Sequence, residues 1–433
     1  MAKTWRIGFG CADIVPDPEN VQPLYISGYN SGREIGGVLD LCQARAVSIA
    51  AGETSVLLIG VDCVALDSGT VKIIRGRLAD LPGYAVNIYA THTHAGPDTL
   101  GLWGPPGVDG KNDAYMERLI DAVESAARRA VGSPKDGALY YGKVHTPDML
   151  YDSRYPHVYD ENLYQLRFAP SDGAAGIRML FYGAHAESLR GENRMLSRDY
   201  PGLLCDYIKE KTGDNAIFMP GAVGGLIMTR EFIPVLTQET ARKNLRITAE
   251  KLAAYVLSIE EERSLAPDMA FTRASFSVPL DNPVFALYKF LGILSSDTVE
   301  GRSATGYHVR SELALLRLDD LTIALIPGEI FPELVCGGEY GRMNPEGINP
   351  RPLAGIAAEH GGGELLIIGL ANDELGYILP PSDFLLHKES PYFKRIKDML
   401  GEDHYEETNS VGPLCAAAVA RAFEEALLSL KEK

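Results

Sequence analysis

The 433-residue sequence lacks features that mark several large protein classes. No run of apolar residues is long enough to span a bilayer, so no transmembrane helix is expected. Basic residues are scarce, 41 against 58 acidic ones, and the net charge of −17 argues against nucleic acid or an anionic membrane surface as a partner. The first residues contain no apolar signal core, so we expect a cytoplasmic protein.

Cysteine is also scarce, and its six residues are scattered without close pairs. Neither a disulfide framework nor a zinc-ribbon spacing is present, so buried, reduced thiols are expected. Internal repeats and low-complexity linkers are lacking as well, and no shift in composition marks a domain boundary. We therefore expect one large domain over residues 1–433.

What the chain does contain is an alternation of strand and helix patterns. The clearest helix patterns cover 112–131, 236–262 and 414–430, and strand patterns include 5–14, 44–50, 55–61, 84–89 and 177–183. Such interleaving predicts an α/β or mixed α+β fold, in which a mixed β-sheet core is flanked by helices.

Two histidines separated by one residue follow the strand pattern at 84–89. Positions i and i+2 of a strand point to the same face, so His92 and His94 are predicted to face one cavity at a strand end. Gly96 and Pro97 then turn the chain away. Paired imidazoles in this position are typical of a metal site or of an acid/base pair.

Other ionisable residues follow apolar runs in the same way: Asp62, His185, Glu329 and Tyr377. In α/β folds, functional groups gather on loops at strand ends, so these residues are candidate partners of the histidine pair. Imidazoles together with a carboxylate suit Zn²⁺ and leave a position open for water or substrate.

The most specific motifs are Thr-His-Thr-His-Ala-Gly-Pro at 91–97 and Gly-Leu-Ala-Asn at 369–372, which is followed by Gly-Tyr at 376–377. Weaker pieces lie in the same order at 8–14, 28–29, 44–46, 60–62, 184–188, 197–202, 327–329, 404–406 and 412–413. Together they resemble the catalytic domain of the neutral/alkaline, non-lysosomal ceramidases over nearly the whole chain. The resemblance implies the fold of that domain and a single-zinc amidase that cleaves N-acyl bonds.

Carried over residue by residue, the resemblance implies the zinc ligands His92, His185, Glu329 and Tyr377. His94 would lie beside the metal as an acid/base or oxyanion partner, and Asp62 or His94 would relay protons. Tyr405 and Arg154 would contact the polar part of the substrate.

Two departures from the family pattern matter. Ceramidases carry a serine in an Asn-Ala-Gly-(Asp/Asn)-x-Ser-Pro-Asn loop, whereas residues 221–228 here read Gly-Ala-Val-Gly-Gly-Leu-Ile-Met, with Leu226 at about the serine position. The immunoglobulin-like C-terminal domain of true ceramidases has no counterpart in this sequence. A small amide, ester or N-acyl substrate is therefore expected rather than a membrane lipid.

We therefore hypothesise a zinc-dependent hydrolase in which zinc-activated water attacks an amide or ester carbonyl, and zinc and His94 stabilise the oxyanion. One alternative is an amidohydrolase-type (β/α)₈ barrel, in which a strand also ends in His-x-His. Another is a catalytically degenerate family member that binds a ligand without turnover, which the missing serine favours. The sequence predicts no oligomeric state.

Overall fold

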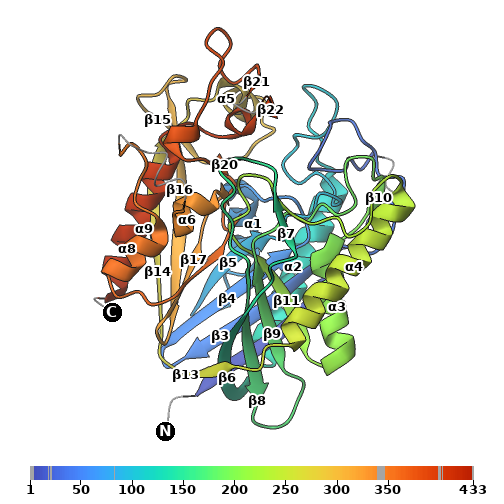
Figure 1. The fold of residues 1–433 in the computed structure, drawn as a ribbon, viewed down its shortest axis with the longest axis vertical. Helices are drawn as coiled ribbons and strands as arrows, with labels where there is room; N and C mark the ends of the chain where they lie inside the picture. Colours follow the sequence, from blue (N-terminus) through green and yellow to red (C-terminus); the bar gives the residue numbers. More distant parts are fainter. Residues whose placement is uncertain are drawn as a thin grey trace.

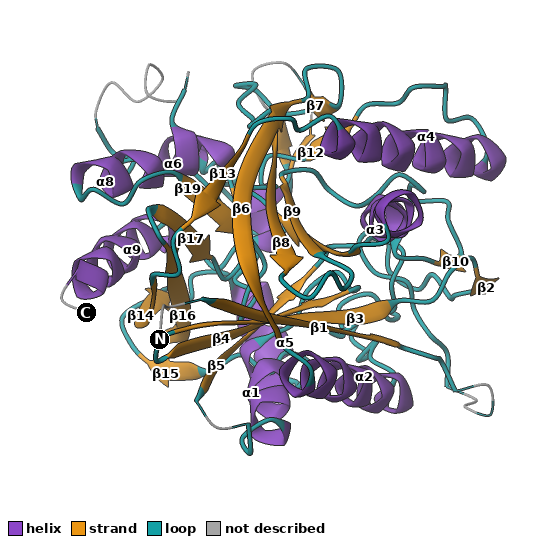
Figure 2. Cartoon of the chain, turned by 90° about the horizontal axis from the view of Figure 1, so that it is seen from below, coloured by secondary structure: helices purple, strands orange, loops and turns teal. Residues whose placement is uncertain are grey.

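Two β-sheets pack face to face in the computed structural model, and helices cover the outer face of each sheet (Figure 2). The structure describes residues 4–17, 19, 22–81, 83–338, 347–397, 401 and 403–431. Figure 1 shows the chain passing from the larger sheet, drawn in blue and green, to the smaller sheet, drawn in yellow and orange.

The larger sheet has the strand order β11-β9-β8-β6-β1-β3-β4-β5, and β13 adds to β6. Its strands are β1 (Trp5–Asp13), β3 (Gln43–Ala51), β4 (Thr54–Val61), β5 (Tyr84–Ala90), β6 (Lys135–His145), β8 (Asn162–Pro170), β9 (Ile177–Tyr182), β11 (Asn215–Pro220) and β13 (Glu262–Leu265). The sheet is mixed, because β4 and β5 run parallel whereas β3 and β4 run antiparallel.

The smaller sheet has the order β14-β16-β17-β19, and β15 adds to β16. Its strands are β14 (Met269–Pro279), β15 (Thr298–Glu300), β16 (Tyr307–Leu318), β17 (Leu321–Leu325) and β19 (Leu365–Ile368). Side chains of both sheets, such as Ile7, Leu58, Leu316 and Ile323, share one buried apolar cluster. This cluster holds the two sheets together.

Eight α-helices are described: α1 (Ser68–Arg77), α2 (Asp113–Gly132), α3 (Asp199–Thr212), α4 (Gln238–Leu257), α5 (Pro283–Phe290), α6 (Pro332–Cys336), α8 (Leu353–Glu359) and α9 (Cys415–Lys431). Helices α1 and α2 cover one part of the larger sheet, α3 and α4 another, and α8 and α9 flank the smaller sheet (Figure 2). No helix in the described part of the chain is long and apolar enough to cross a membrane.

Helix α2 shows how the local sequence produces this packing. The Asn112 side chain caps the helix by accepting from the Tyr115 amide, and Tyr115, Leu119 and Val123 are buried at helical spacing, as predicted. Strand β1 approaches closely, because a Cβ at Gly10 would lie 2.0 Å from the Ala126 carbonyl oxygen. Only glycine permits this contact between helix and strand.

The predicted mixed α/β fold is confirmed, and the (β/α)₈ barrel is wrong. Antiparallel neighbours such as β1–β3 and β3–β4 exclude a barrel of alternating parallel strands. The helix predicted at 236–262 is too long, since α4 ends at Leu257 and Glu262 begins β13. Pairing of β13 with β6 explains why helical periodicity gives way at that point.

Short two-stranded pairs at the strand ends shape the site: β2 (Gly37–Val38) with β10 (Met195–Leu196), β7 (Leu150–Asp152) with β12 (Ile227–Thr229), β18 (Glu329–Ile330) with β20 (Tyr377–Ile378), and β21 (Ile396–Lys397) with β22 (Asp403–His404). Two 3₁₀ turns, η1 (Pro381–Asp383) and η2 (Glu406–Asn409), flank the last pair. These pairs bring distant segments to one end of the sheets.

Candidate metal centre

The His-x-His motif lies just beyond β5, which ends at Ala90. His92 has a positive φ of 66°, which a residue with a side chain rarely adopts, so the chain turns there instead of continuing as a strand. The two rings nevertheless converge, with Nε2 of His94 3.3 Å from Nε2 of His92. The predicted convergence is correct, but a backbone turn produces it rather than strand alternation.

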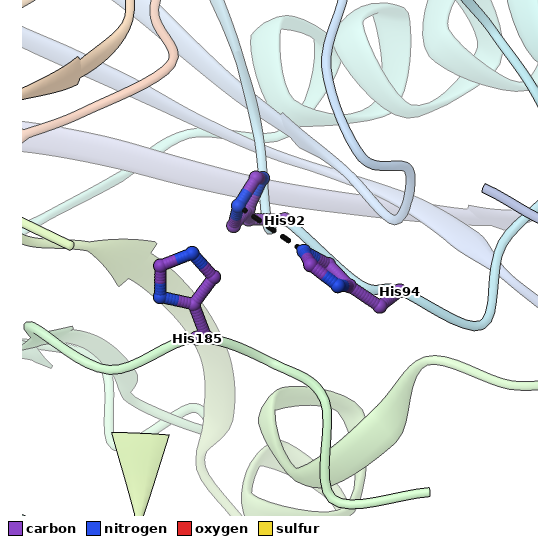
Figure 3. A group of neighbouring side chains, drawn as sticks. All are labelled: His92, His94 and His185. Carbon is purple, nitrogen blue, oxygen red and sulfur yellow. Dashed lines mark hydrogen bonds between the residues drawn. The ribbon is translucent and has the colours of Figure 1, made fainter. Parts of the chain in front are cut away.

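His185 reaches the same point from the segment that follows β9. Its backbone N–H and its Nδ1–H both donate to the Ile227 carbonyl, at 2.8 and 3.0 Å. Its ring centroid lies 4.8 Å from that of His92 and 5.5 Å from that of His94. Figure 3 shows the three rings facing one another, His92 and His94 from one loop and His185 from another.

Glu329 and Tyr377 enter through the β18–β20 pair, in which they are direct partners. Glu329 Oε2 lies 3.3 Å from His92 Nε2 and 3.1 Å from His185 Nε2. We call His92, His94, His185 and Glu329 the histidine cluster. Tyr377 is buried beside Glu329 and lines the same cavity.

The proton positions in this cluster leave a place at its centre for added protons or a metal ion. His92 Nδ1 lies 2.8 Å from the Val64 carbonyl, which can only accept, so Nδ1 carries hydrogen, as does Nδ1 of His185. The Nε2 atoms of the neutral rings then turn lone pairs toward each other and toward the Glu329 carboxylate. Protons or a metal ion must occupy the centre, and backbone carbonyls that hold Nδ1 are typical of metal-bound histidine.

Electrostatics agree with this arrangement. Burial raises the pKa of the Glu329 carboxyl, but His92 and His185 outweigh burial and hold that pKa below its usual range. Burial lowers the pKa of His185, whereas its hydrogen bond to Glu329 raises it above the ordinary value. Burial and the two neighbouring histidines hold the pKa of His94 well below its usual range, so His94 is a neutral imidazole.

His94 differs from the other two histidines. Its buried Nδ1 has no hydrogen-bond partner, and the nearest acidic oxygen, Oε2 of Glu187, lies 3.6 Å away. That oxygen accepts a 2.5 Å hydrogen bond from the Tyr29 hydroxyl. The backbone thus fixes His92 and His185 as ligands would be fixed, whereas His94 stands at the side of the cluster.

A cavity of about 420 Å³ opens above the histidine cluster. Its apolar wall contains Val64, Ala65, Leu100, Leu102, Trp103, Leu226, Phe285 and Leu294. Its polar wall contains Tyr29, Asn30, Glu187, Glu374, Tyr377, Arg395, Tyr405 and Asn409. Small-molecule sites have this composition, a largely apolar cavity with a few convergent polar groups. A larger hollow lies near Lys72 and Arg310, away from the histidines.

Asp62 is not brought to this cavity. Its carboxylate accepts from the Gln43 amide at 2.9 Å and from the Thr91 hydroxyl at 3.0 Å, and burial raises its pKa to about 6. The first bond ties the end of β4 to the start of β3, and the second holds it against the residue before His92. The structure therefore gives Asp62 contacts that position the loop and none with the cavity.

Tyr405 lines the cavity as predicted, and Arg154 contacts it indirectly. The Arg154 guanidinium pairs with Glu406 and lies 5.3 Å from the Tyr405 ring centroid. Leu226 lines the cavity at the position where the family resemblance expects serine, and it has a positive φ of 59°.

Four residues of the site were not assigned from the sequence: Tyr29, Glu187, Glu374 and Arg395. Glu374 Oε1 accepts from the Gly376 amide at 2.9 Å, its Oε2 is buried without a hydrogen bond, and burial raises its pKa well above the usual range. Glu187 stands two residues after His185 in the sequence, and this spacing is the one signal that points to Glu187 as a site residue. Arg395 lies in a polar segment that carries no motif.

The fold and the cluster define a class: a two-sheet α/β protein with a candidate metal centre at its strand ends. No protein-family model matches the chain. It is 23% identical over 241 residues to the neutral ceramidase of Drosophila pseudoobscura pseudoobscura, and 23% identical over 243 residues to neutral ceramidase A of Dictyostelium discoideum. Each match covers 50% of this chain and about a third of the relative, 34% and 33%.

Solved structures give the same result for the fold. The crystal structure of neutral ceramidase from Pseudomonas aeruginosa matches 100% of this chain and 75% of its own, with a TM-score of 0.76 at 16% identity. A ceramidase complexed with C2 matches 99% of this chain and 75% of its own, with a TM-score of 0.73 and 16% identity. The chain is thus similar to neutral ceramidases in sequence over half of its length and in fold over all of it, a divergent resemblance that its motifs predicted.

Proposed function

We propose that the chain is a zinc-dependent hydrolase of amide or ester bonds in small or N-acyl compounds. The observation that carries the proposal is the histidine cluster at the base of a largely apolar cavity. Similarity to ceramidases supports an amide as the bond, while the missing serine leaves ceramide itself a weaker candidate.

The cluster fits a zinc ion, since imidazole nitrogens and carboxylate oxygens are its usual ligands. His92, His185, Glu329 and Tyr377 would hold it. When bound, zinc would polarise a carbonyl and make water available as a nucleophile near neutral pH. The cluster's buried lone pairs, which face one another, are the feature that such an ion would satisfy.

The chain's own residues would perform three tasks. The apolar wall would bind an acyl or similar apolar group and exclude water. His94, a neutral imidazole outside the backbone-fixed pair, would donate a hydrogen bond to the reacting oxygen or accept a proton from water. Tyr29 would keep Glu187 beside His94 through its hydrogen bond, which holds the ring in place.

The test is metal content together with turnover. Purified protein should bind about one zinc ion per chain and should hydrolyse members of a panel of N-acyl amides, esters and lactones. His185→Ala and His92→Ala should lose both properties. Zinc-free wild-type protein after reconstitution would contradict the proposal.

A second candidate function is ligand binding without turnover, and Leu226 favours it because an apolar side chain occupies the expected serine position. The two functions differ in outcome. Full zinc occupancy with no hydrolysis of any panel member, together with saturable binding of N-acyl compounds, would identify the binder.

A further inference from the structure

We propose that Arg395 forms a subsite for a carboxylate, so that the cavity selects N-acyl compounds whose amine part carries that group, as in N-acyl amino acids. The inference deepens the proposed function and rests on it for the position of the scissile bond. Its observations come from the segment between β20 and α9, which carries β21 and β22 near the upper end of the molecule in Figure 1.

Arg395 is exposed at the side of the cavity, and its guanidinium lies 4.9 Å from the Tyr405 ring centroid. A guanidinium that stacks on an aromatic ring keeps its donors in a fixed plane, which suits bidentate recognition of a carboxylate. Arg395 is therefore held in an orientation suited to a ligand.

The two arginines beside Tyr405 differ in their partners. Arg154 is neutralised by the buried Glu406. Arg395 forms no ion pair with a carboxylate in the described part of the chain. Asp403, which lies in the same hairpin, pairs with Lys397 at 2.6 Å and is only a longer-range electrostatic neighbour of Arg395. Arg395 thus presents a positive charge beside the cavity that no described ion pair neutralises.

The carboxylates that line the cavity interact with groups other than Arg395. Glu329 contacts two histidines, and Glu187 accepts from Tyr29. Glu374 bonds the Gly376 amide, and burial favours its neutral form. An anionic ligand group beside Arg395 would therefore find a cation without a competing protein carboxylate bound to it.

The base of the hairpin is fixed, so the subsite has a defined place. His404, at the end of β22, lies 2.7 Å from Glu407 Oε1 and 3.5 Å from Asp383 Oδ2. The Leu385 amide also donates to Glu407, at 2.7 Å. These contacts tie the segment that carries Arg395 to the turn that follows Tyr405.

The order of groups in the substrate follows from the walls of the cavity. Apolar side chains such as Trp103 and Phe285 suit the acyl chain, and the histidine cluster would take the carbonyl. Arg395 and Tyr405 remain for the other part of the molecule. A single guanidinium matches the single charge of a carboxylate better than a phosphate dianion, which usually has several donors.

The test compares three ligands of equal acyl length: N-dodecanoylglycine, N-dodecanoylethanolamine and N-dodecanoyl-phosphoethanolamine. Binding is followed by tryptophan fluorescence, since Trp103 lines the cavity and the second tryptophan, Trp5, is buried in the core. Variants are Arg395→Gln and, as a matched control, Lys394→Gln, which removes the same charge from the exposed neighbouring residue.

Wild-type protein should bind the glycine compound about tenfold or more tightly than the neutral ethanolamide, because a charge-assisted pair is gained. Arg395→Gln should abolish this difference and leave ethanolamide binding within about twofold, while Lys394→Gln should keep it. Equal affinities in wild type, or equal losses for both ligands in Arg395→Gln, would overturn the inference. Tightest, Arg395-dependent binding of the phosphate compound would overturn the choice of carboxylate.

Hydrolysis separates this inference from the proposed function. If Arg395-dependent binding of the glycine compound occurs but the zinc-loaded protein cleaves none of the three ligands, the subsite stands and the hydrolase fails. If the ethanolamide and the glycine compound are cleaved with equal kcat/KM and bound equally, the hydrolase stands and the subsite fails.

Discussion

Two clusters in this chain combine histidine with carboxylates, and they differ in the groups that balance the carboxylate charge. In the histidine cluster, His92 and His185 fix Nδ1 on backbone carbonyls and turn Nε2 toward Glu329. In the second, which we call the His404 cluster (His404, Asp383, Glu406 and Glu407), the imidazole lies between carboxylates. Only the first lines the cavity.

The two clusters differ in whether their own residues balance the charges that they bring together. His404 as an imidazolium forms ion pairs with Glu407 Oε1 at 2.7 Å and with Asp383 Oδ2 at 3.5 Å, and Arg154 pairs with Glu406. The His404 cluster is therefore complete as an ion-pair network. The histidine cluster has three imidazoles and one carboxylate whose atoms converge, and we propose that a metal ion completes it. Similar residues thus predict a metal site in the histidine cluster and a stabilising ion-pair network in the His404 cluster.

The largest expected effect tests this contrast directly. His185→Ala should lower zinc content from about one ion per chain to almost none, and it should cost about a thousandfold in kcat/KM, because metal catalysis supplies several kcal/mol. His404→Gln should keep its zinc. Elemental analysis after dialysis against a weak chelator measures the zinc content of both variants, and steady-state kinetics measures kcat/KM.

Equal loss of zinc in the two variants would remove the distinction between the clusters. Circular dichroism spectra of both variants serve as the control, since an unfolded protein would lose metal whatever its ligands.

The second effect concerns stability. His404→Gln leaves the buried carboxylate of Glu407 and the partly exposed carboxylate of Asp383 without a cation, so the free energy of unfolding should fall by about 3 kcal/mol. The double variant His404→Gln/Glu407→Gln should recover part of that loss, because one of the unpaired charges is gone. Urea unfolding measures both, and a double variant less stable than the single one would contradict the ion-pair account.

The third effect is the pH dependence of that stability. Burial lowers the pKa of His404, but the carboxylates outweigh it and raise the pKa to about 10. Because the folded pKa is above the unfolded value of about 6.5, the stabilisation is full below that pH and is lost as pH rises toward 10. Wild-type stability should fall through this range, and the gap to His404→Gln should close.

Thermal unfolding at several pH values between 6 and 10 checks this prediction. A gap that stays constant over the range would mean that His404 is not charged in the folded state.

The sequence predicts the histidine cluster better than its surroundings, for a physical reason. Strand ends are local features, so apolar runs locate His92, His185 and Glu329 without any knowledge of the fold. Their convergence depends on β18–β20 pairing and on the left-handed turn at His92, and neither has a local signal. The family resemblance supplied Tyr377 and Tyr405, which periodicity alone leaves unassigned.

The cavity walls could not be predicted in the same way. Trp103 and Phe285 are almost two hundred residues apart, and Arg395 comes from a polar excursion whose position depends on the His404 cluster. Such contacts depend on loop paths and side-chain directions, which periodicity does not encode. Asp62 is a different case, because both of its oxygens accept hydrogen bonds from neighbouring segments, and its role as a proton relay stays a prediction.

The smallest effect concerns Asp62. Its bond to Thr91 supports the loop that carries His92, much as the ion pair of His404 with Glu407 supports the hairpin that carries Arg395. Asp62→Asn keeps one acceptor for Gln43 or Thr91, so unfolding free energy should fall by only about 1–2 kcal/mol and zinc should be retained. Since burial raises the pKa of Asp62 to about 6, a proton relay through it would place an acidic limb near that pH in the kcat/KM profile. We expect the limb, if present in wild type, to persist in Asp62→Asn. Its disappearance would return Asp62 to the catalytic machinery and would show that the loop around His92 carries protons as well as holding a ligand.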